Sequence, residues 1–351
     1  MNGIRRYVPV TLIVLAIAGG PFVLIWLLGP ATTASGAPEL VGLQGWVSSD
    51  PLTLAGLRGK VVIIDFWTYS CINCLRTIPY LNAWYERYRD DGLAIIGVHS
   101  PEFSFERDAA RVERAVRRLQ IRYPIALDSD KRTWQAYANQ YWPHKYLIDR
   151  DGNIRHTQIG EGGYSEMEQR IRELLTEGGH ALTSPSADVV AERVDPKAIA
   201  TPEIYMGSYF GQFLGNPLGL RSMRSAEYAV PETLEPNLCY LAGRWTIGEE
   251  AVKAVASGEH RIALHYTAKA VNWVAGAPGR LLEVEVLRNG RPLTPQTAGS
   301  DVVIDASGRS IVQIGEERLY RLIDDRSGYG THTVTVVFSQ EGLESYTFTF
   351  G

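Results

Sequence analysis

The chain is poor in cysteine and has no excess of positive charge. Only three of its 351 residues are cysteines, which excludes a scaffold held together by many disulfides. The formal net charge of −4 lacks the basic excess that binding to a phosphate backbone requires, so we expect no nucleic-acid partner. The length exceeds what one hydrophobic core usually serves, and two domains are therefore expected.

Charged side chains are also missing from a stretch near the N-terminus, residues 7–28. As a helix, this stretch is long enough to cross a bilayer of about 30 Å. Arg5-Arg6 precede it and should stay inside, which places the bulk of the chain outside the cytoplasm. Residues 1–28 are thus predicted to be a membrane anchor and 29–38 a linker. A cleaved signal peptide is the alternative, because Ser35-Gly36-Ala37 has small residues at the right spacing.

Strands and helices are predicted to alternate over residues 39–180. The run Val61–Trp67 is apolar apart from Asp65, which is typical of a strand buried on both faces. A helical spacing of apolar residues follows it, and a hairpin with an Asp151-Gly152 turn comes near the end. This succession predicts an α/β sandwich.

The residue pattern changes after residue 180. Residues 181–200 are rich in Ser, Pro, Asp and Ala and are predicted to be a linker. From residue 201 to 351, apolar and polar residues alternate, with Gly, Pro, Asn or Asp between the runs, which predicts an all-β jelly roll or related sandwich. The alternation is clearest in Arg261–Tyr266, Leu282–Leu287, Val302–Ile304, Val334–Phe338 and Tyr346–Phe350.

Two of the three cysteines, Cys71 and Cys74, are separated by only two residues. Cys71 follows the buried strand and stands at the start of the helix that carries Cys74, where unpaired N–H groups and the helix dipole favour a thiolate. We expect Cys71 to be the exposed nucleophile and Cys74 to resolve the mixed disulfide. The motif predicts a redox-active Cys71–Cys74 disulfide and no organic cofactor.

Half of a zinc site is the other interpretation of this spacing. The remaining ligands would have to come from Cys239 and one of seven scattered histidines, and the sequence has no second Cys-x-x-Cys or His-x-x-x-His pair. We therefore expect no metal, and we interpret Cys239 as an inert buried thiol.

The residues around the cysteines resemble the thioredoxin superfamily. Asp65-Phe66-Trp67, three further residues and the Cys71/Cys74 pair match the active-site strand and first helix of that fold, and Trp142-Pro143 stands where the fold places a cis-proline. The longer string of residues 65–77, DFWTYSCINCLRT, resembles the C-terminal part of DipZ-type thiol:disulfide interchange proteins, and the likeness spans roughly residues 40–351. DipZ-type proteins carry a multi-span electron-conducting domain ahead of this part. Here one apolar segment stands in its place, so the electron donor is expected to be a separate integral-membrane protein.

The resemblance implies roles for several residues. Asp65 would be a buried carboxylate that relays a proton to and from Cys74, in keeping with the raised pKa expected for a carboxyl on a strand buried on both faces. A surface aspartate at a strand end is the alternative. Pro143, in the cis form, would pack against the disulfide and present the Trp142 backbone to a client, whereas a trans loop proline is the alternative.

Further residues near the motif are candidates on position alone. Trp67 and Tyr69 could wall the site or belong to the core. His99 and Glu102 follow the second predicted strand and could face the cysteines in proton transfer or partner choice, or could serve the loop structurally. His144 follows Pro143 and could raise the local positive potential.

Taken together, these patterns predict a membrane-tethered thiol-disulfide oxidoreductase on the extracytoplasmic side of a bacterial cell membrane, with protein thiols and disulfides as clients. The direction of electron flow depends on its reduction potential relative to those of its partners. Two alternatives remain. One is a cell-envelope binding module with accessory thiols, and the other is a thiol peroxidase, against which the Cys-x-x-Cys pair at a helix start argues.

For the β domain, the resemblance implies a jelly roll of the carbohydrate-binding-module type. Its aromatic residues could stack on the rings of a glycan, but most are expected in the core of a sandwich. A docking surface for clients is preferred to a glycan site. The aromatic residues concerned are Tyr205, Tyr209, Phe210, Phe213, Trp245 and Trp273.

Overall fold

A computed structural model describes the chain from residue 36 onward, apart from residues 180, 183–184, 188, 190, 192–193, 210–212 and 217–224. The predicted anchor lies outside the described residues. Within the described part, no helix combines the length and the apolar character needed to cross a membrane. By their contacts, the described residues fall in one compact unit, Ser35–Gly351.

A six-stranded sheet forms the centre of the first domain, as far as that domain is described. Its strands are β1 (Gly45–Val47), β2 (Val61–Trp67), β3 (Leu93–His99), β4 (Ile125–Leu127), β5 (His144–Ile148) and β6 (Ile154–Ile159). They lie in the order β1-β4-β3-β2-β5-β6, in which β2, β3 and β4 are parallel and the other pairs are antiparallel. All seven residues of β2 are buried, as its apolar run predicts.

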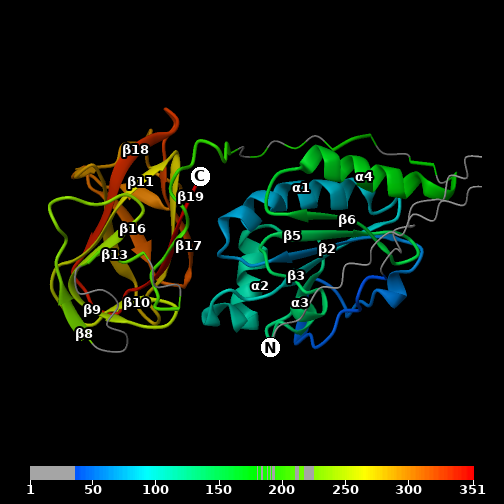
Figure 1. The fold of residues 1–351 in the computed structure, drawn as a ribbon, viewed down its shortest axis with the longest axis horizontal. Helices are drawn as coiled ribbons and strands as arrows, with labels where there is room; N and C mark the ends of the chain where they lie inside the picture. Colours follow the sequence, from blue (N-terminus) through cyan, green and yellow to red (C-terminus); the bar gives the residue numbers. More distant parts are fainter. Residues whose placement is uncertain are drawn as a thin grey trace, which may run out of the picture. The chain divides into compact units, whose positions relative to one another are not determined.

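Helices cover both faces of this sheet. They are α1 (Ile72–Tyr88), α2 (Ala109–Arg118), α3 (Arg132–Ala136) and α4 (Tyr164–Thr176), with shorter 3-10 turns η1 (Ala55–Leu57), η2 (Ser104–Arg107) and η3 (Glu177–Gly179). Alternate residues of β2 face opposite sides: Ile63 packs in a core with α1 and α4, and Ile64 in a core with α3. Figure 1 shows α1 and α4 along the same face of the sheet. The predicted α/β sandwich is confirmed, and it places the start of α1 just after the end of β2.

Two separate elements, η2 and α2, lie within residues 104–118. Asp108 lies in extended backbone between η2 and α2. Its carboxylate accepts hydrogen bonds from the N–H groups of Ala110 and Arg111, so it caps a new helix and does not continue the old one. The interruption leaves Glu106, on η2, fully buried.

The described part of the C-terminal region is all-β, as predicted. Its strand pairs are antiparallel, and the main hydrogen-bonded path runs β15-β16-β13-β18-β11-β9-β10-β19-β12-β17. The strands are β7 (Ile204–Tyr205), β8 (Ser225–Tyr228), β9 (Cys239–Ile247), β10 (Val252–Ala254), β11 (His260–Ala268), β12 (Ala270–Gly276), β13 (Leu282–Arg288), β14 (Arg291–Pro292), β15 (Val302–Ile304), β16 (Ser310–Ile314), β17 (Arg318–Asp324), β18 (Gly330–Phe338) and β19 (Glu344–Phe350).

Large aromatic residues of the β domain mostly fill its core. Trp245 and Trp273 are fully buried, and Phe213 packs against the same core from a half-buried position. Tyr209 is different, because 78% of its side chain is exposed. Phe210 lies outside the described residues. The prediction that these aromatics serve the core is thus confirmed for the two tryptophans.

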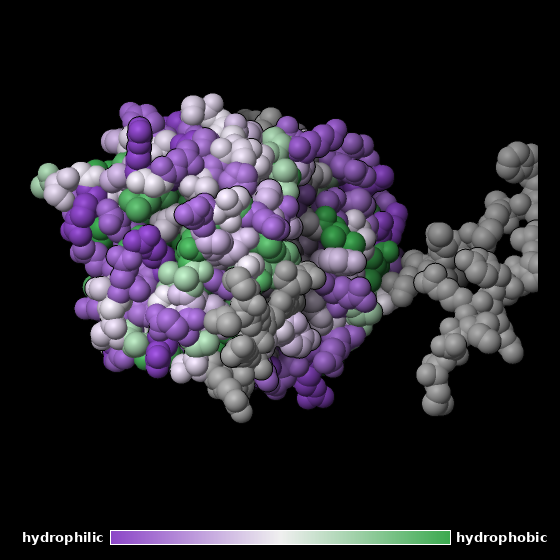
Figure 2. Space-filling model, turned by 60° about the vertical axis from the view of Figure 1, so that its left-hand side comes forward, coloured by the Kyte–Doolittle hydropathy of each residue, from purple (hydrophilic) through white to green (hydrophobic). Residues whose placement is uncertain are grey.

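The two domains share a buried contact at η2 and α2. The ring of Phe105 lies 4.8 Å from that of Tyr346 on β19, and the core beneath α1 also contains Val274 and Leu319 of the β domain. Ion pairs flank this apolar contact, for example Arg111 Nη1 to Glu317 Oε2 at 2.5 Å. The β domain therefore packs directly on the segment that follows β3. On the face shown in Figure 2, hydrophilic residues predominate and hydrophobic residues form small separate groups.

Candidate active site

Cys71 occupies the N-cap position of α1. Its backbone is extended, and its Sγ accepts a hydrogen bond from the N–H of Cys74 at 3.3 Å. Cys71 is partly exposed, whereas Cys74 is buried with 1% exposure, which agrees with the predicted division into nucleophile and resolving thiol. Both are free thiols in this structure, so the disulfide between them stays a prediction.

The Trp142-Pro143 peptide bond is cis, as expected from the resemblance. The thiol of Cys71 lies 3.9 Å from the carbonyl oxygen of Trp142, to which it donates a weak hydrogen bond. The indole N–H of Trp142 donates to the carbonyl of Ser100 at 2.9 Å, which fixes the ring against the loop after β3. The segment before Pro143 thus faces the cysteine with its backbone.

The surroundings of Cys71 do not favour its thiolate as the sequence predicts. Hydrogen bonds from Cys74, chiefly from its thiol and to a smaller extent from its backbone N–H, lower the pKa of the Cys71 thiol, but burial and the negative charges of Glu102 and Glu203 outweigh them, so the pKa is raised. The position of Cys71 at a helix N-terminus is therefore not enough to predict the pKa of its thiol. Two carboxyl groups distant in sequence raise this pKa and oppose the effect of the helix.

Asp65 is fully buried on β2 and belongs to an ion pair. Its Oδ1 lies 3.4 Å from Nζ of Lys145, a residue of the neighbouring strand β5 that is equally buried. Burial raises the pKa of Asp65, although the charge of Lys145 opposes the shift. Burial, the hydrogen bond to Cys71 and the charge of Asp65 together raise the pKa of Cys74 well above its usual range. Asp65 is thus close enough to influence Cys74, and the surface alternative is wrong.

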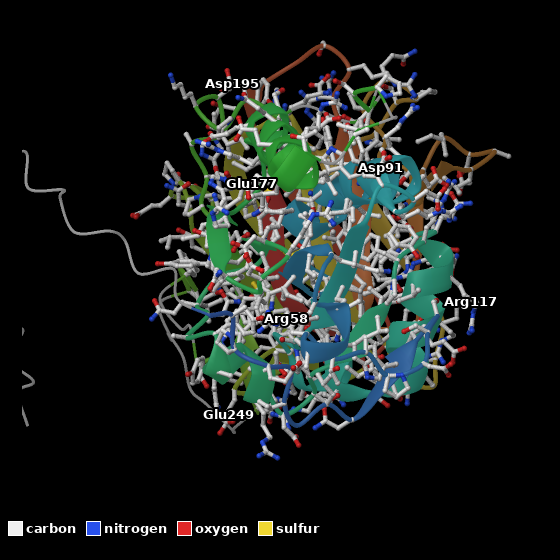
Figure 3. The ribbon with its side chains drawn as sticks, turned by 90° about the vertical axis from the view of Figure 1, so that its right-hand side faces the viewer. Arg58, Asp91, Arg117, Glu177, Asp195 and Glu249 are labelled. Atoms are coloured by element: carbon white, nitrogen blue, oxygen red, sulfur yellow. The ribbon has the colours of Figure 1, made fainter. Side chains whose placement is uncertain are left out.

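A cavity of about 780 Å³ opens at Cys71 and is lined by both domains. The thioredoxin-like side provides, among others, Cys71, Glu102, Lys131 and Trp142, and the β domain provides Glu203, Tyr205, Tyr209, Glu249, Glu250 and Thr347. Glu249 lies at the outer edge of the molecule in the view of Figure 3. Sequence reasoning places Glu102 near the cysteines but does not reveal that the opposite wall comes from residues more than 100 positions away.

Glu102 is the candidate accessory residue that faces the cavity. It is half-buried, and burial and the charge of Glu106 raise its pKa to about 8, while a hydrogen bond with Tyr205 opposes this shift. The carboxyl Oε1 lies 2.6 Å from the hydroxyl of Tyr205. A carboxyl with such a pKa exchanges protons near neutrality.

Glu106 connects the loop before Cys71 to the loop that carries Glu102. Its Oε1 accepts hydrogen bonds from the hydroxyls of Thr68 and Ser70, and its Oε2 accepts from the N–H groups of Glu102 and Phe103 at 2.6 and 3.0 Å. Sequence reasoning missed this residue. The buried side of a short turn such as η2 leaves no periodic signal that could have identified it.

The other candidates do not reach the cavity. His99 is buried between the rings of Trp67 and Tyr69, and burial lowers its pKa to about 3, so it is neutral and structural. Trp67 and Tyr69 are themselves core residues and do not wall the site.

The prediction that His144 raises the local positive potential is wrong. Burial lowers its pKa to about 4, which leaves the ring neutral near pH 7. Its Nδ1 lies 2.6 Å from Oδ1 of Asn139, which lines the cavity at Cys71, whereas His144 itself is not a lining residue. The strand position of His144, next to Pro143 but turned to the core, explains the error.

Among the described residues, no three His, Cys, Asp or Glu side chains gather in a way that could hold a metal ion. Cys239 is fully buried in the core of the β domain, where burial raises its pKa. The interpretation of Cys239 as a buried thiol is confirmed.

Two family models match the chain. Residues 37–157 match the AhpC/TSA family, and residues 201–351 match a family described as a thioredoxin like C-terminal domain. A solved structure described as the solution structure of a thioredoxin-like protein in the oxidized form is 31% identical, with a TM-score of 0.39, and the match covers 42% of this chain and 99% of that one.

Curated relatives extend the likeness. Protein DipZ of Mycobacterium tuberculosis is 41% identical over 273 residues, which cover 75% of this chain and 38% of that protein. The chain therefore spans well under half the length of DipZ. The thiol-disulfide oxidoreductase YkuV of Bacillus subtilis is 31% identical over 140 residues, which cover 40% of this chain and 94% of that protein. The chain belongs to the family of thioredoxin-like thiol-disulfide oxidoreductases, with DipZ-type proteins among its relatives over three quarters of its length.

Proposed function

We propose that the chain exchanges dithiol and disulfide with protein clients through Cys71 and Cys74. The observation that supports this most is the placement of Cys71: partly exposed at the N-cap of α1, at a cavity, with buried Cys74 one turn further along. In the proposed reaction, the Cys71 thiolate attacks a client disulfide and forms a mixed disulfide. Cys74 then attacks the Sγ of Cys71, which releases the client as a thiol and leaves the Cys71–Cys74 disulfide.

The surroundings suggest how each step is assisted. The backbone of Trp142, ahead of cis-Pro143, is positioned to pair with a client segment, because its carbonyl already lies beside Cys71. Asp65 is the proposed acceptor of the proton that Cys74 must lose, since its burial raises its pKa toward the range of a useful general base. No organic cofactor takes part in this proposal.

The β domain is proposed to recognise clients and not to act as a glycan platform. Its residues form one wall of the cavity at Cys71, whereas its two buried tryptophans are committed to the core. The antiparallel pairing of its strands is compatible with a jelly roll, which we retain as the proposed topology.

The proposed setting is the extracytoplasmic side of a bacterial membrane. Its support is the uncharged stretch of residues 7–28 after Arg5-Arg6. The electron donor is proposed to be a separate integral-membrane protein that reduces the Cys71–Cys74 disulfide.

The test of the exchange reaction compares wild type with Cys71→Ser and Cys74→Ser in insulin reduction and in exchange with glutathione. Wild type should be active and Cys71→Ser inactive, whereas Cys74→Ser should accumulate a mixed disulfide through Cys71. Cys71 should also be alkylated at lower pH than Cys74, because burial raises the pKa of Cys74 further. Equal activity of wild type and Cys71→Ser would contradict the proposal and favour a binding module with accessory thiols.

A further inference from the structure

The β domain contributes a tyrosine to the wall of the cavity that opens at Cys71. Tyr205, at the end of β7, lines the same cavity as Cys71, and its hydroxyl lies 2.6 Å from Oε1 of Glu102. The same hydroxyl lies 3.1 Å from Oε2 of Glu203, another residue of the β domain. Two carboxyl groups from two domains thus contact one phenol in the cavity that opens at the proposed nucleophile.

Glu102 is the main acceptor of the Tyr205 hydrogen. A tyrosine hydroxyl has a single hydrogen, and the contact to Glu102, at 2.6 Å, is shorter than the contact to Glu203, at 3.1 Å. Only one oxygen of the Glu102 carboxyl is used in this hydrogen bond, so the other oxygen can carry a proton. Tyr205 therefore fixes the Glu102 carboxyl in the wall of the cavity.

The surroundings of Glu102 favour its protonated form. It is half-buried, burial and the charges of Glu106 and Glu203 raise its pKa, and the charge of Lys131 lowers it. These surroundings agree with a pKa of about 8 for Glu102. The phenol of Tyr205 stays protonated, because burial and the two neighbouring carboxyls raise its pKa.

We infer that the β domain completes the exchange site: Tyr205 positions Glu102 in the cavity at Cys71, and Glu102 gives its proton to the sulfur that leaves the client disulfide. The inference rests on the proposed function. A bond forms between Cys71 Sγ and one client sulfur while the client S–S bond breaks, and its electron pair departs on the second sulfur. That thiolate takes the proton of Glu102, which leaves a client thiol and a Glu102 carboxylate.

The step explains why an acidic group lines the same cavity as a thiol that must ionise. A carboxylate at this place opposes the Cys71 thiolate by like charge, whereas a protonated Glu102 does not. The protonated form therefore permits the attack and supplies the proton in the same step. Glu102 acts on the reacting sulfur, and Tyr205 is a positioning residue.

The experiment varies the basicity of the leaving sulfur. Glutathione disulfide releases an aliphatic thiolate that needs a proton, whereas an aromatic nitrobenzoate disulfide releases a thiolate that is stable without one. Rates of mixed-disulfide formation are measured for both reagents, in full-length protein with Cys74→Ser so that resolution cannot follow. The readout is the rate with glutathione disulfide divided by the rate with the aromatic reagent. Changes in the ionisation of Cys71 affect both rates equally and cancel in this ratio.

Glu102→Gln should slow the reaction with glutathione disulfide by about 10²-fold near pH 7, the lower range of general-acid effects, and leave the aromatic reagent unchanged or faster. Tyr205→Phe should change the ratio in the same direction. In the parent protein, the ratio should fall as the pH rises through the pKa of Glu102. In Tyr205→Phe this fall should occur at higher pH, because the hydrogen bond that lowers the pKa of Glu102 is lost. Tyr346→Phe is the matched control: it removes a tyrosine–glutamate hydrogen bond of the β domain, to Glu344, outside the cavity lining.

Equal slowing of both reagents in Glu102→Gln would overturn the inference, since it would indicate a role in folding or binding. An unchanged ratio in both variants would overturn it as well. If Glu102→Gln does not fold, the ratio in Tyr205→Phe decides, with circular dichroism as the check on folding. Failure of the Cys74→Ser parent to react with either reagent would contradict the proposed function instead.

Discussion

Lys145 determines how the role of Asp65 can be tested. The two side chains form an ion pair in which each is only 2% exposed. Removing one partner of a buried pair leaves the other charge uncompensated and typically costs about 3–5 kcal/mol. A single substitution of Asp65 therefore mixes a loss of stability with any loss of proton transfer.

We predict that Asp65→Asn lowers the free energy of unfolding by about 3–5 kcal/mol, and that Asp65→Asn with Lys145→Met recovers most of this loss. Urea unfolding measures both. In single-turnover kinetics, the double variant should resolve the mixed disulfide about 10²-fold more slowly at pH 6 and less so at pH 9, where Cys74 ionises more readily unaided. Resolution at the wild-type rate throughout this range would assign Asp65 a purely structural role.

At the level of elements, the site depends on two loops that Glu106 holds together. One precedes α1 and contains Ser70, and the other follows β3 and contains Glu102. A glutamine has the same shape but replaces one acceptor oxygen with a donor, so it cannot accept all of these hydrogen bonds. Hydrogen bonds to a charged group contribute about 1.5–3 kcal/mol each, so both loops should loosen together.

We predict that Glu106→Gln lowers the free energy of unfolding by about 2–5 kcal/mol. The backbone amides of Glu102 and Phe103 should exchange hydrogen faster, which mass spectrometry after deuterium labelling detects. Glu113→Gln is the control, because Glu113 forms an exposed pair with Arg117, worth about 0.3–0.5 kcal/mol. If the two variants behave alike, the loops are held by other contacts.

Local patterns in the sequence predicted the elements better than the contacts between them. The apolar run of β2, the Cys-x-x-Cys motif at the start of α1 and cis-Pro143 are encoded within short stretches, and the structure confirms them. The partners of the site are not local: Lys145 is 80 positions from Asp65, and Tyr205 is 103 positions from Glu102. A single sequence contains no signal for such pairs, and the pKa of Cys71 was misjudged for that reason.

On the scale of the whole molecule, the two domains share a core. Phe105 packs against Tyr346 of β19, and Val274 and Leu319 belong to the same buried cluster as residues of α1. Shared apolar burial of this kind couples the unfolding of the two parts. The described domains are thus expected to behave as one cooperative unit.

We predict that Phe105→Ala destabilises both domains, with a cost of about 3–5 kcal/mol for the lost packing. Hydrogen exchange should accelerate for β2 in the first domain and for β19 in the second. Val303→Ala, at a position that is 68% exposed, should change neither. Faster exchange confined to β2 would show that the domains unfold independently.

The cavity at Cys71, lined by both domains, should also limit which client disulfides can react. Its volume of about 780 Å³ matches that of pockets for small molecules, about 300–1,000 Å³, and is far smaller than a folded domain. Under the proposed function, we expect the β-domain wall to keep a disulfide on a flat or recessed client surface away from Cys71. We therefore expect the protein to react with client disulfides that protrude from their surroundings. Disulfides on flexible loops or on chains that have not finished folding should react, whereas those of compact, mature proteins should not.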